Sequence, residues 1–184
     1  MKRLLAVVLL ACLAAACFSA AAETTRKFDD FSITADDGAI IEAGEKKNGA
    51  ILCTVYPYAG SGDSATNFNV LWGDEKNLVF QLNEFLEGQR QNEESVRNGY
   101  KQYGIELKSY EVTGAAEEVL WEQYAVRCDI YTTLASGDRE IDVIQRVYLL
   151  SGDYGTYVIT LSADTEANIR KMAGELPKLI QWKY

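Results

Sequence analysis

Residues 119–163, VLWEQYAVRCDIYTTLASGDREIDVIQRVYLLSGDYGTYVITLSA, contain the most regular pattern of the chain. Apolar side chains recur at every second position, and two Ser-Gly-Asp triplets, at 136–138 and 151–153, interrupt the alternation. A period of two is typical of β-strands, and Gly with Asp between such runs is typical of turns. The segment therefore predicts three antiparallel strands joined by two turns.

Upstream of this segment, Ile105–Thr113 predicts another strand, with residues 114–118 as the connection. Before that strand the period changes to that of a helix, on the evidence of Leu78, Leu82, Phe85 and Leu86. This helix should begin at Asn77 and run to about Gly88. The polar stretch at 90–99 is compatible with a second helix or with a bent extension of the first.

The N-terminal third predicts four strands. Phe28–Ile33 and Ala39–Ala43 flank Asp36-Asp37-Gly38, and Asp-Gly between two such runs favours a β-hairpin. Ala50–Tyr58 is apolar on both faces, which is typical of an internal strand, and Pro57 should end it. Asn67–Trp72 is the fourth strand.

After the three-strand segment, a closing helix is expected. Asp164 or Thr165 can cap its N-terminus. Its apolar stripe consists of Ile169, Met172, Ala173 and Leu176. Gly174 and Pro177 should break or kink the helix near its end, and residues 179–182 should form a last turn or a short strand. Strands in a mainly antiparallel sheet with helices between and after them indicate an α+β sandwich.

The N-terminus of the chain predicts export. A basic start is followed by 13 apolar residues, Leu4–Ala16, and by small residues up to Ala22. This is the pattern of a signal peptide over 1–22, and the apolar run is shorter than the roughly 20 residues of a membrane span. A competing interpretation is a lipobox at 13–17, whose Cys17 would be lipidated and would anchor the protein. Both place the folded part outside the cytoplasm, in the periplasm or secreted.

Composition excludes several classes of function. The chain of 184 residues contains no histidine, which removes a Ser-His-Asp triad, a Cys-His pair and a His-ligated metal. Its net charge is -9, and loss of residues 1–22 would leave 16 basic and 27 acidic residues, a net charge of -11. Such an acidic chain is not expected to bind nucleic acid.

Two cysteines, Cys53 and Cys128, remain beyond the signal region. In an oxidising compartment they could pair, and closing a loop of about 75 residues would contribute roughly 3–5 kcal/mol. The alternative is two separate apolar thiols in the core. The sequence leaves both interpretations open, with the disulfide preferred.

The order of these elements resembles a known group of folds. Phe31-Ser32-Ile33, then residues 67–70, a helix, the strand at 105–113, the meander ending at 157–163 and the closing helix are similar to the PsbP/Mog1-like sandwich families. Within them the chain is most similar to the bacterial extracytoplasmic branch that includes DcrB. The resemblance implies a single domain over 28–184. The polar residues at 23–27 before it are expected to be flexible.

The resemblance also implies a function by contact rather than catalysis. PsbP-like members dock on a membrane photosystem, Mog1-like members bind a small GTPase, and DcrB-like members are envelope proteins. It implies no catalytic residues, no cofactor and no metal. The expected partner is another envelope protein, with membrane contact only if Cys17 is lipidated.

Two hypotheses about the binding surface follow. A protein-binding or assembly module would use acidic side chains together with exposed aromatic residues, for which the candidates are Tyr56, Tyr58, Trp72 and Trp121. The alternative is a small-ligand binder or a hydrolase with two carboxylates in a cleft, about 5–10 Å apart. The second would need a concave site, which the sequence does not identify.

Overall fold

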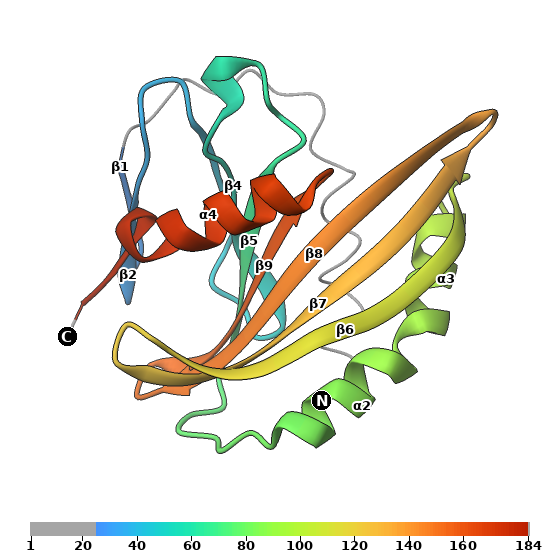
Figure 1. The fold of residues 1–184 in the computed structure, drawn as a ribbon. Helices are drawn as coiled ribbons and strands as arrows, with labels where there is room; N and C mark the ends of the chain where they lie inside the picture. Colours follow the sequence, from blue (N-terminus) through green and yellow to red (C-terminus); the bar gives the residue numbers. More distant parts are fainter. Residues whose placement is uncertain (1–24, 184) are drawn as a thin grey trace.

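The computed structural model describes residues 25–183, which form two antiparallel sheets and three α-helices (Figure 1). The strands are β1 (Thr25–Lys27), β2 (Phe31–Thr34), β3 (Ile40–Ala43), β4 (Ala50–Tyr56), β5 (Asn67–Gly73), β6 (Glu106–Leu120), β7 (Gln123–Ser136), β8 (Arg139–Gly152), β9 (Gly155–Ala163) and β10 (Ile180–Trp182). The helices are α2 (Leu82–Gln91), α3 (Glu93–Lys101) and α4 (Glu166–Leu179), with a 3-10 turn, η1, at Ala59–Ser61. The predicted signal region and Cys17 lie outside the described residues. No helix in the described part is long and apolar enough to cross a membrane.

The larger sheet has the order β3-β4-β5-β9-β8-β7-β6. Its last three sequential strands, β7, β8 and β9, form the meander that the alternation predicts. Tight turns at 137–138 and 153–154 join them. Every residue of β9 is buried, because β5 and β8 flank it and both of its faces are covered. The predicted α+β sandwich is confirmed.

The predicted hairpin between β2 and β3 is wrong. The turn itself forms, since the Ala39 amide donates to the Asp36 carbonyl at 3.0 Å, and Gly38 has a φ of 92°. However, β3 pairs with β4 in the large sheet, whereas β2 pairs with β1 and β10 in a sheet of three. Thr25–Lys27, which belong to the segment expected to be flexible, form β1 and pair with β2.

Helix α2 begins later than expected, at Leu82 rather than Asn77. The backbone of Asn77 has a φ of 51°, and its amide donates to the Gly152 carbonyl at 3.2 Å. The Leu78 amide donates to the Ser151 hydroxyl at 3.0 Å. These contacts hold the backbone of Asn77 and Leu78 against the β8–β9 turn, so the helix begins only after this segment. The polar stretch that follows forms a second helix, α3, one of the two predicted alternatives.

Helix α4 is capped by Thr165, whose hydroxyl accepts from the Asn168 amide at 3.3 Å. Gly174 and Pro177 do not end it, since the helix continues to Leu179. Pro177 lies in the last turn, so its missing N–H removes at most one hydrogen bond there. The chain then forms β10, the short strand that was one of two alternatives for its end.

Strand β6 includes residues 114–118, which the sequence predicts as a connection. The register shifts between Thr113 and Ala116, and the pairing with β7 then resumes as far as Leu120. Gly114 has a φ of 58° in this bulge. A bulge absorbs additional residues without ending the strand, which is why a Gly-Ala-Ala stretch can continue it.

Two layers cover the large sheet. Helix α4 and the small sheet pack on one face, where Phe31, Ile159 and Met172 belong to the same core cluster. Helices α2 and α3 pack on the other face, against β6 and β7, with Phe85 in contact with a second cluster. Figure 1 shows α4 crossing the sheet while the β7–β8 hairpin projects beyond it at the upper right. This projecting end carries the candidate site.

Candidate functional site

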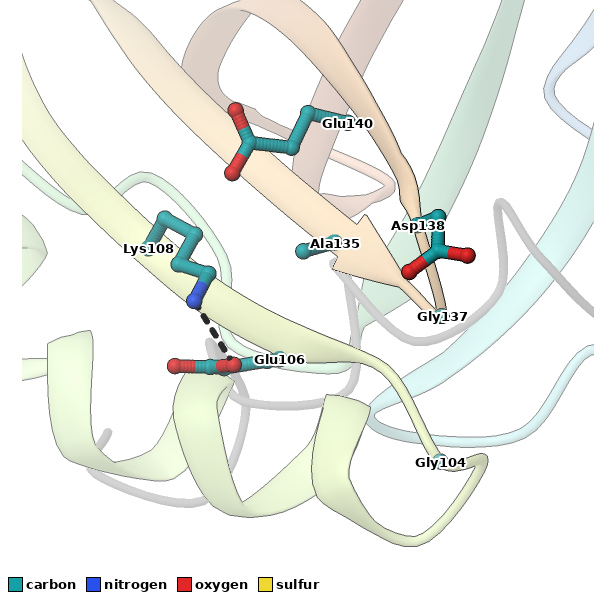
Figure 2. A pocket seen from close by; sticks show the side chains of 7 residues that line it. All are labelled: Gly104, Glu106, Lys108, Ala135, Gly137, Asp138 and Glu140. Atoms are coloured by element: carbon teal, nitrogen blue, oxygen red, sulfur yellow. Dashed lines mark ion pairs between the residues drawn. The ribbon is translucent and has the colours of Figure 1, made fainter.

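A hollow lies at the projecting end of the β6–β7–β8 sheet, and we refer to it as the acidic groove. Its volume is about 420 Å³, and its lining residues are Gly104, Glu106, Lys108, Ala135, Gly137, Asp138 and Glu140 (Figure 2). Ala135 pairs with Glu106 on one side and with Glu140 on the other, so these three side chains share one face of the sheet. Adjacent strands thereby bring together carboxylates that lie far apart in sequence.

The groove contains three carboxylates and one ammonium group. The Lys108 Nζ lies 2.9 Å from Glu106 Oε2, and this hydrogen bond raises the pKa of Lys108, so the ammonium stays protonated. Asp138 and Glu140 add two further negative charges, and all four side chains are exposed. The groove thus has a net negative charge and is suited to a cationic partner group.

The alternative hypothesis of a hydrolase requires two carboxyl groups with different protonation states beside an enclosed substrate. In the acidic groove the Glu106 carboxylate is already ion-paired with Lys108. Among the described residues, no group of three or more cysteine or acidic side chains is arranged to hold a metal ion. The arrangement therefore supports charge recognition more directly than catalysis.

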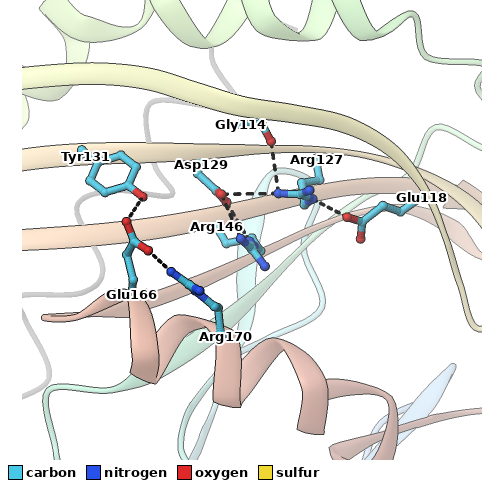
Figure 3. Close-up of polar contacts among 8 residues, drawn as sticks. All are labelled: Gly114, Glu118, Arg127, Asp129, Tyr131, Arg146, Glu166 and Arg170. Carbon is cyan, nitrogen blue, oxygen red and sulfur yellow. Dashed lines mark hydrogen bonds and ion pairs between the residues drawn. The ribbon is translucent and has the colours of Figure 1, made fainter.

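The same face of the sheet continues from the groove into a network of charged side chains (Figure 3). Arg146 donates to both oxygens of Asp129, at 2.7 and 2.9 Å, and these hydrogen bonds raise the pKa of the guanidinium. Arg127 lies 3.3 Å from Asp129, is also ion-paired with Glu118, and donates to the Gly114 carbonyl. Because Asp129 is buried, its charge depends on these two arginines.

A second group of contacts connects this face to helix α4. The Tyr131 hydroxyl donates to Glu166 Oε1 at 3.1 Å, and Arg170 is ion-paired with the same carboxylate (Figure 3). The Arg170 hydrogen bond, together with that of Tyr131, lowers the pKa of Glu166. These contacts connect β7 to α4 on the same face of the sheet as the Asp129 network.

The four aromatic candidates do not form an exposed patch, so this prediction is wrong. Tyr56 is buried, and the other three are half-buried. The Tyr58 hydroxyl donates to Glu175 on α4. The Trp72 indole donates to the Tyr154 carbonyl at 3.1 Å, and the Trp121 indole donates to the Ile180 carbonyl at 3.0 Å. Tyr58, Trp72 and Trp121 each connect two parts of the fold instead.

Cys53 and Cys128 are both free and buried, which contradicts the preferred disulfide and fits the alternative of two core thiols. Three strands separate β4 from β7, so the two residues lie about 19 Å apart at the usual strand spacing. A disulfide needs Cα atoms within about 7 Å. The thiols also belong to the clusters on opposite faces of the sheet.

The sequence pattern predicts a turn at 136–138 but no binding site at the residues of the acidic groove. Glu106 and Glu140 are 34 positions apart, and only the pairing of β6 with β7 and of β7 with β8 brings them together. The Ser-Gly-Asp triplets at 136–138 and 151–153 both predict a turn, so the triplet itself does not distinguish the end of the sheet that carries the groove. The usable signal was the concentration of charge around the first, where Asp138, Arg139 and Glu140 are consecutive.

No protein-family model matches the chain, and no curated protein matches it in sequence. Among solved structures, cyanobacterial PsbP (CyanoP) from Synechocystis sp. PCC 6803 is similar, with a TM-score of 0.55 and 10% identity over 92% of this chain and 99% of that one. PA94 from Pseudomonas aeruginosa, a protein of unknown function, has a TM-score of 0.41 at 13% identity, with 84% of this chain and 91% of that one covered. LpqN of Mycobacterium tuberculosis, involved in cell envelope biogenesis, has a TM-score of 0.42 at 10% identity, with 84% of this chain and 83% of that one covered. The DcrB-like branch stays a prediction. The likeness to CyanoP shows that this chain has a PsbP-like α+β fold.

Proposed function

We propose that this chain is a non-enzymatic binding module of the cell envelope, and that its acidic groove holds a basic segment of another envelope protein. The observation that carries the proposal is the groove itself, in which Glu106, Asp138 and Glu140 surround a hollow at the projecting end of the sheet. Charge complementarity of this kind steers encounter and selects partners.

Two further features support this function. The groove is formed by the paired strands β6, β7 and β8, so its backbone is held in place before a partner binds. The signal-peptide pattern at 1–22 predicts that the protein reaches an extracytoplasmic compartment, with lipid attachment only if Cys17 is modified. The PsbP-like fold supports a role by contact, by analogy of fold.

The test is crosslinking and pull-down from envelope extracts with wild-type protein and a groove variant, Glu106→Gln/Asp138→Asn/Glu140→Gln. The matched control, Glu84→Gln/Glu87→Gln/Glu94→Gln, removes as many charges from α2 and α3, on the other side of the sheet. We expect wild type and control to recover the same partner and the groove variant to recover at least tenfold less. Equal recovery by all three proteins would refute a role for the groove.

A further inference from the structure

A second hollow lies at the opposite end of the molecule, where the small sheet meets the end of β3. Its volume is about 220 Å³. Its lining residues are Arg26, Lys27, Phe28, Asp29, Ala43, Gly44, Lys46 and Leu52, and we refer to it as the basic pocket. It contains three cations and one carboxylate, so its net charge is positive, whereas the chain as a whole has a net charge of -9.

The cation on one wall is held in place by the fold. Lys46 Nζ lies 2.6 Å from Asp30 Oδ2 and 4.9 Å from the centre of the Trp72 ring. Asp30 is buried and also accepts from the Tyr157 hydroxyl at 2.7 Å. Because Asp30 is held between two donors, the Lys46 side chain is oriented, and 29% of it remains accessible.

The charge balance of the pocket remains positive after Asp30 is counted. Asp30 and Asp29 both lie near the Lys46 ammonium, at 2.6 and 3.8 Å, so these two carboxylates stand against the three lining cations, Arg26, Lys27 and Lys46. Lys183 contributes another positive charge, because its ammonium donates to the carbonyls of Phe28 and Asp29. Asp29 is 80% exposed and lies 3.8 Å from Lys46, so it can turn towards solvent when an anion enters.

The rest of the lining is apolar, with Phe28 and Leu52 beside the cations. Lysine and arginine donors match the oxygens of a phosphate, and an apolar wall suits the carbon chain that carries it. We propose that the basic pocket binds an organic phosphate, whose phosphate group contacts Arg26, Lys27 and Lys46 and whose carbon part packs on Phe28. This ligand can come from a phospholipid headgroup or from a soluble phosphate ester.

Binding is tested with the folded protein by two-dimensional ¹H–¹⁵N NMR during titration with glycerol 3-phosphate, and by co-sedimentation with vesicles. The vesicles contain phosphatidylcholine alone or phosphatidylcholine with phosphatidylglycerol. We expect shifts of the amides at 26–29 and 43–46 with the soluble ester, or sedimentation only with phosphatidylglycerol. The first result identifies a soluble ligand and the second a lipid headgroup.

Variants of the exposed charges make the test specific. Lys27→Gln should weaken binding about three- to fivefold, as expected for one partly solvated charge pair, and Asp29→Asn should strengthen it by a similar factor. Lys101→Gln, on α3 across the sheet, removes the same charge and should change nothing. Lys46→Gln is not used alone, because it would leave Asp30 buried without its cation. No binding in either arm, or equal affinity of all variants, would overturn the proposal.

Discussion

The two buried thiols show how position in the sheet determines chemistry at the level of a residue. Burial raises the pKa of Cys53 far above its usual value, and burial together with Asp129 raises that of Cys128 to about 12. The thiolate is the reactive form of cysteine, so both side chains should be inert in the native protein. Neither residue faces the acidic groove or the basic pocket, and both serve as core residues.

These pKa values predict a pH dependence of stability. An unfolded cysteine ionises near 9.0, whereas native Cys128 ionises near 12, so its contribution is complete below pH 9 and is lost as the pH rises towards 12. Between pH 9 and pH 10.5 this thiol should lower the free energy of unfolding by about 1.6 kcal/mol. Urea unfolding of wild type and Cys128→Ala measures the difference in slope. Equal slopes of the free energy of unfolding against pH in the two proteins would contradict the prediction. The inertness of the thiols is checked separately: a disulfide reagent at pH 8 should label both cysteines only after unfolding.

At the level of an element, the bulge in β6 requires glycine at position 114, because Asp129 of the charge network lies directly beside it. A Cβ atom added to Gly114 would lie 2.9 Å from Asp129 Oδ2, and the φ of 58° is unfavourable for other residues. Gly114→Ala should therefore lower the free energy of unfolding by about 1–3 kcal/mol. Urea unfolding measures this effect.

The matched control for this substitution is Gly88→Ala in helix α2. No atom lies within 4 Å of a Cβ added there, and alanine is a better helix former, so stability should rise by about 0.5–1 kcal/mol. Loss of stability in both variants would mean that the effect of Gly114→Ala is not specific to the bulge. Gain in both would mean that Asp129 yields to the added methyl group.

The elements also show where sequence patterns suffice. Alternation and turn residues predict β7, β8 and β9, because successive side chains of a strand point to opposite faces of the sheet and each of these strands is joined to the next by a tight turn. Local pattern does not predict which sheet a strand joins, and the turn at 36–38 is a corner between sheets rather than a hairpin. Gly38 and Gly60 meet at this corner, where a Cβ on Gly38 would lie 2.8 Å from the Gly60 Cα atom.

The acidic groove likewise depends on pairing between strands that are distant in sequence, β6 with β7 and β7 with β8. Its residues could therefore not be identified from the local sequence pattern.

At the level of the whole molecule, the two ends of the described chain close the fold together. β2 lies between β1 and β10, so the first and last strands share a sheet. Trp182 joins that sheet to the rest, since its ring lies 5.0 Å from Phe31, 4.6 Å from Tyr157 and 5.8 Å from Trp121, measured between ring centres. Arg26 and Lys27 of the same sheet also line the basic pocket.

Trp182→Ala should therefore lower the free energy of unfolding by about 2–4 kcal/mol, since it removes a large aromatic ring from three partners. Trp182→Phe keeps part of this packing and should recover about half of the loss. Tyr103→Ala, at a side chain that is 54% exposed, should stay within about 0.5 kcal/mol of wild type. Urea unfolding followed by circular dichroism ranks the three variants. If Trp182→Ala unfolds at the same urea concentration as Tyr103→Ala, β10 does not stabilise the sandwich, and the small sheet would instead depend on β1 and β2 alone.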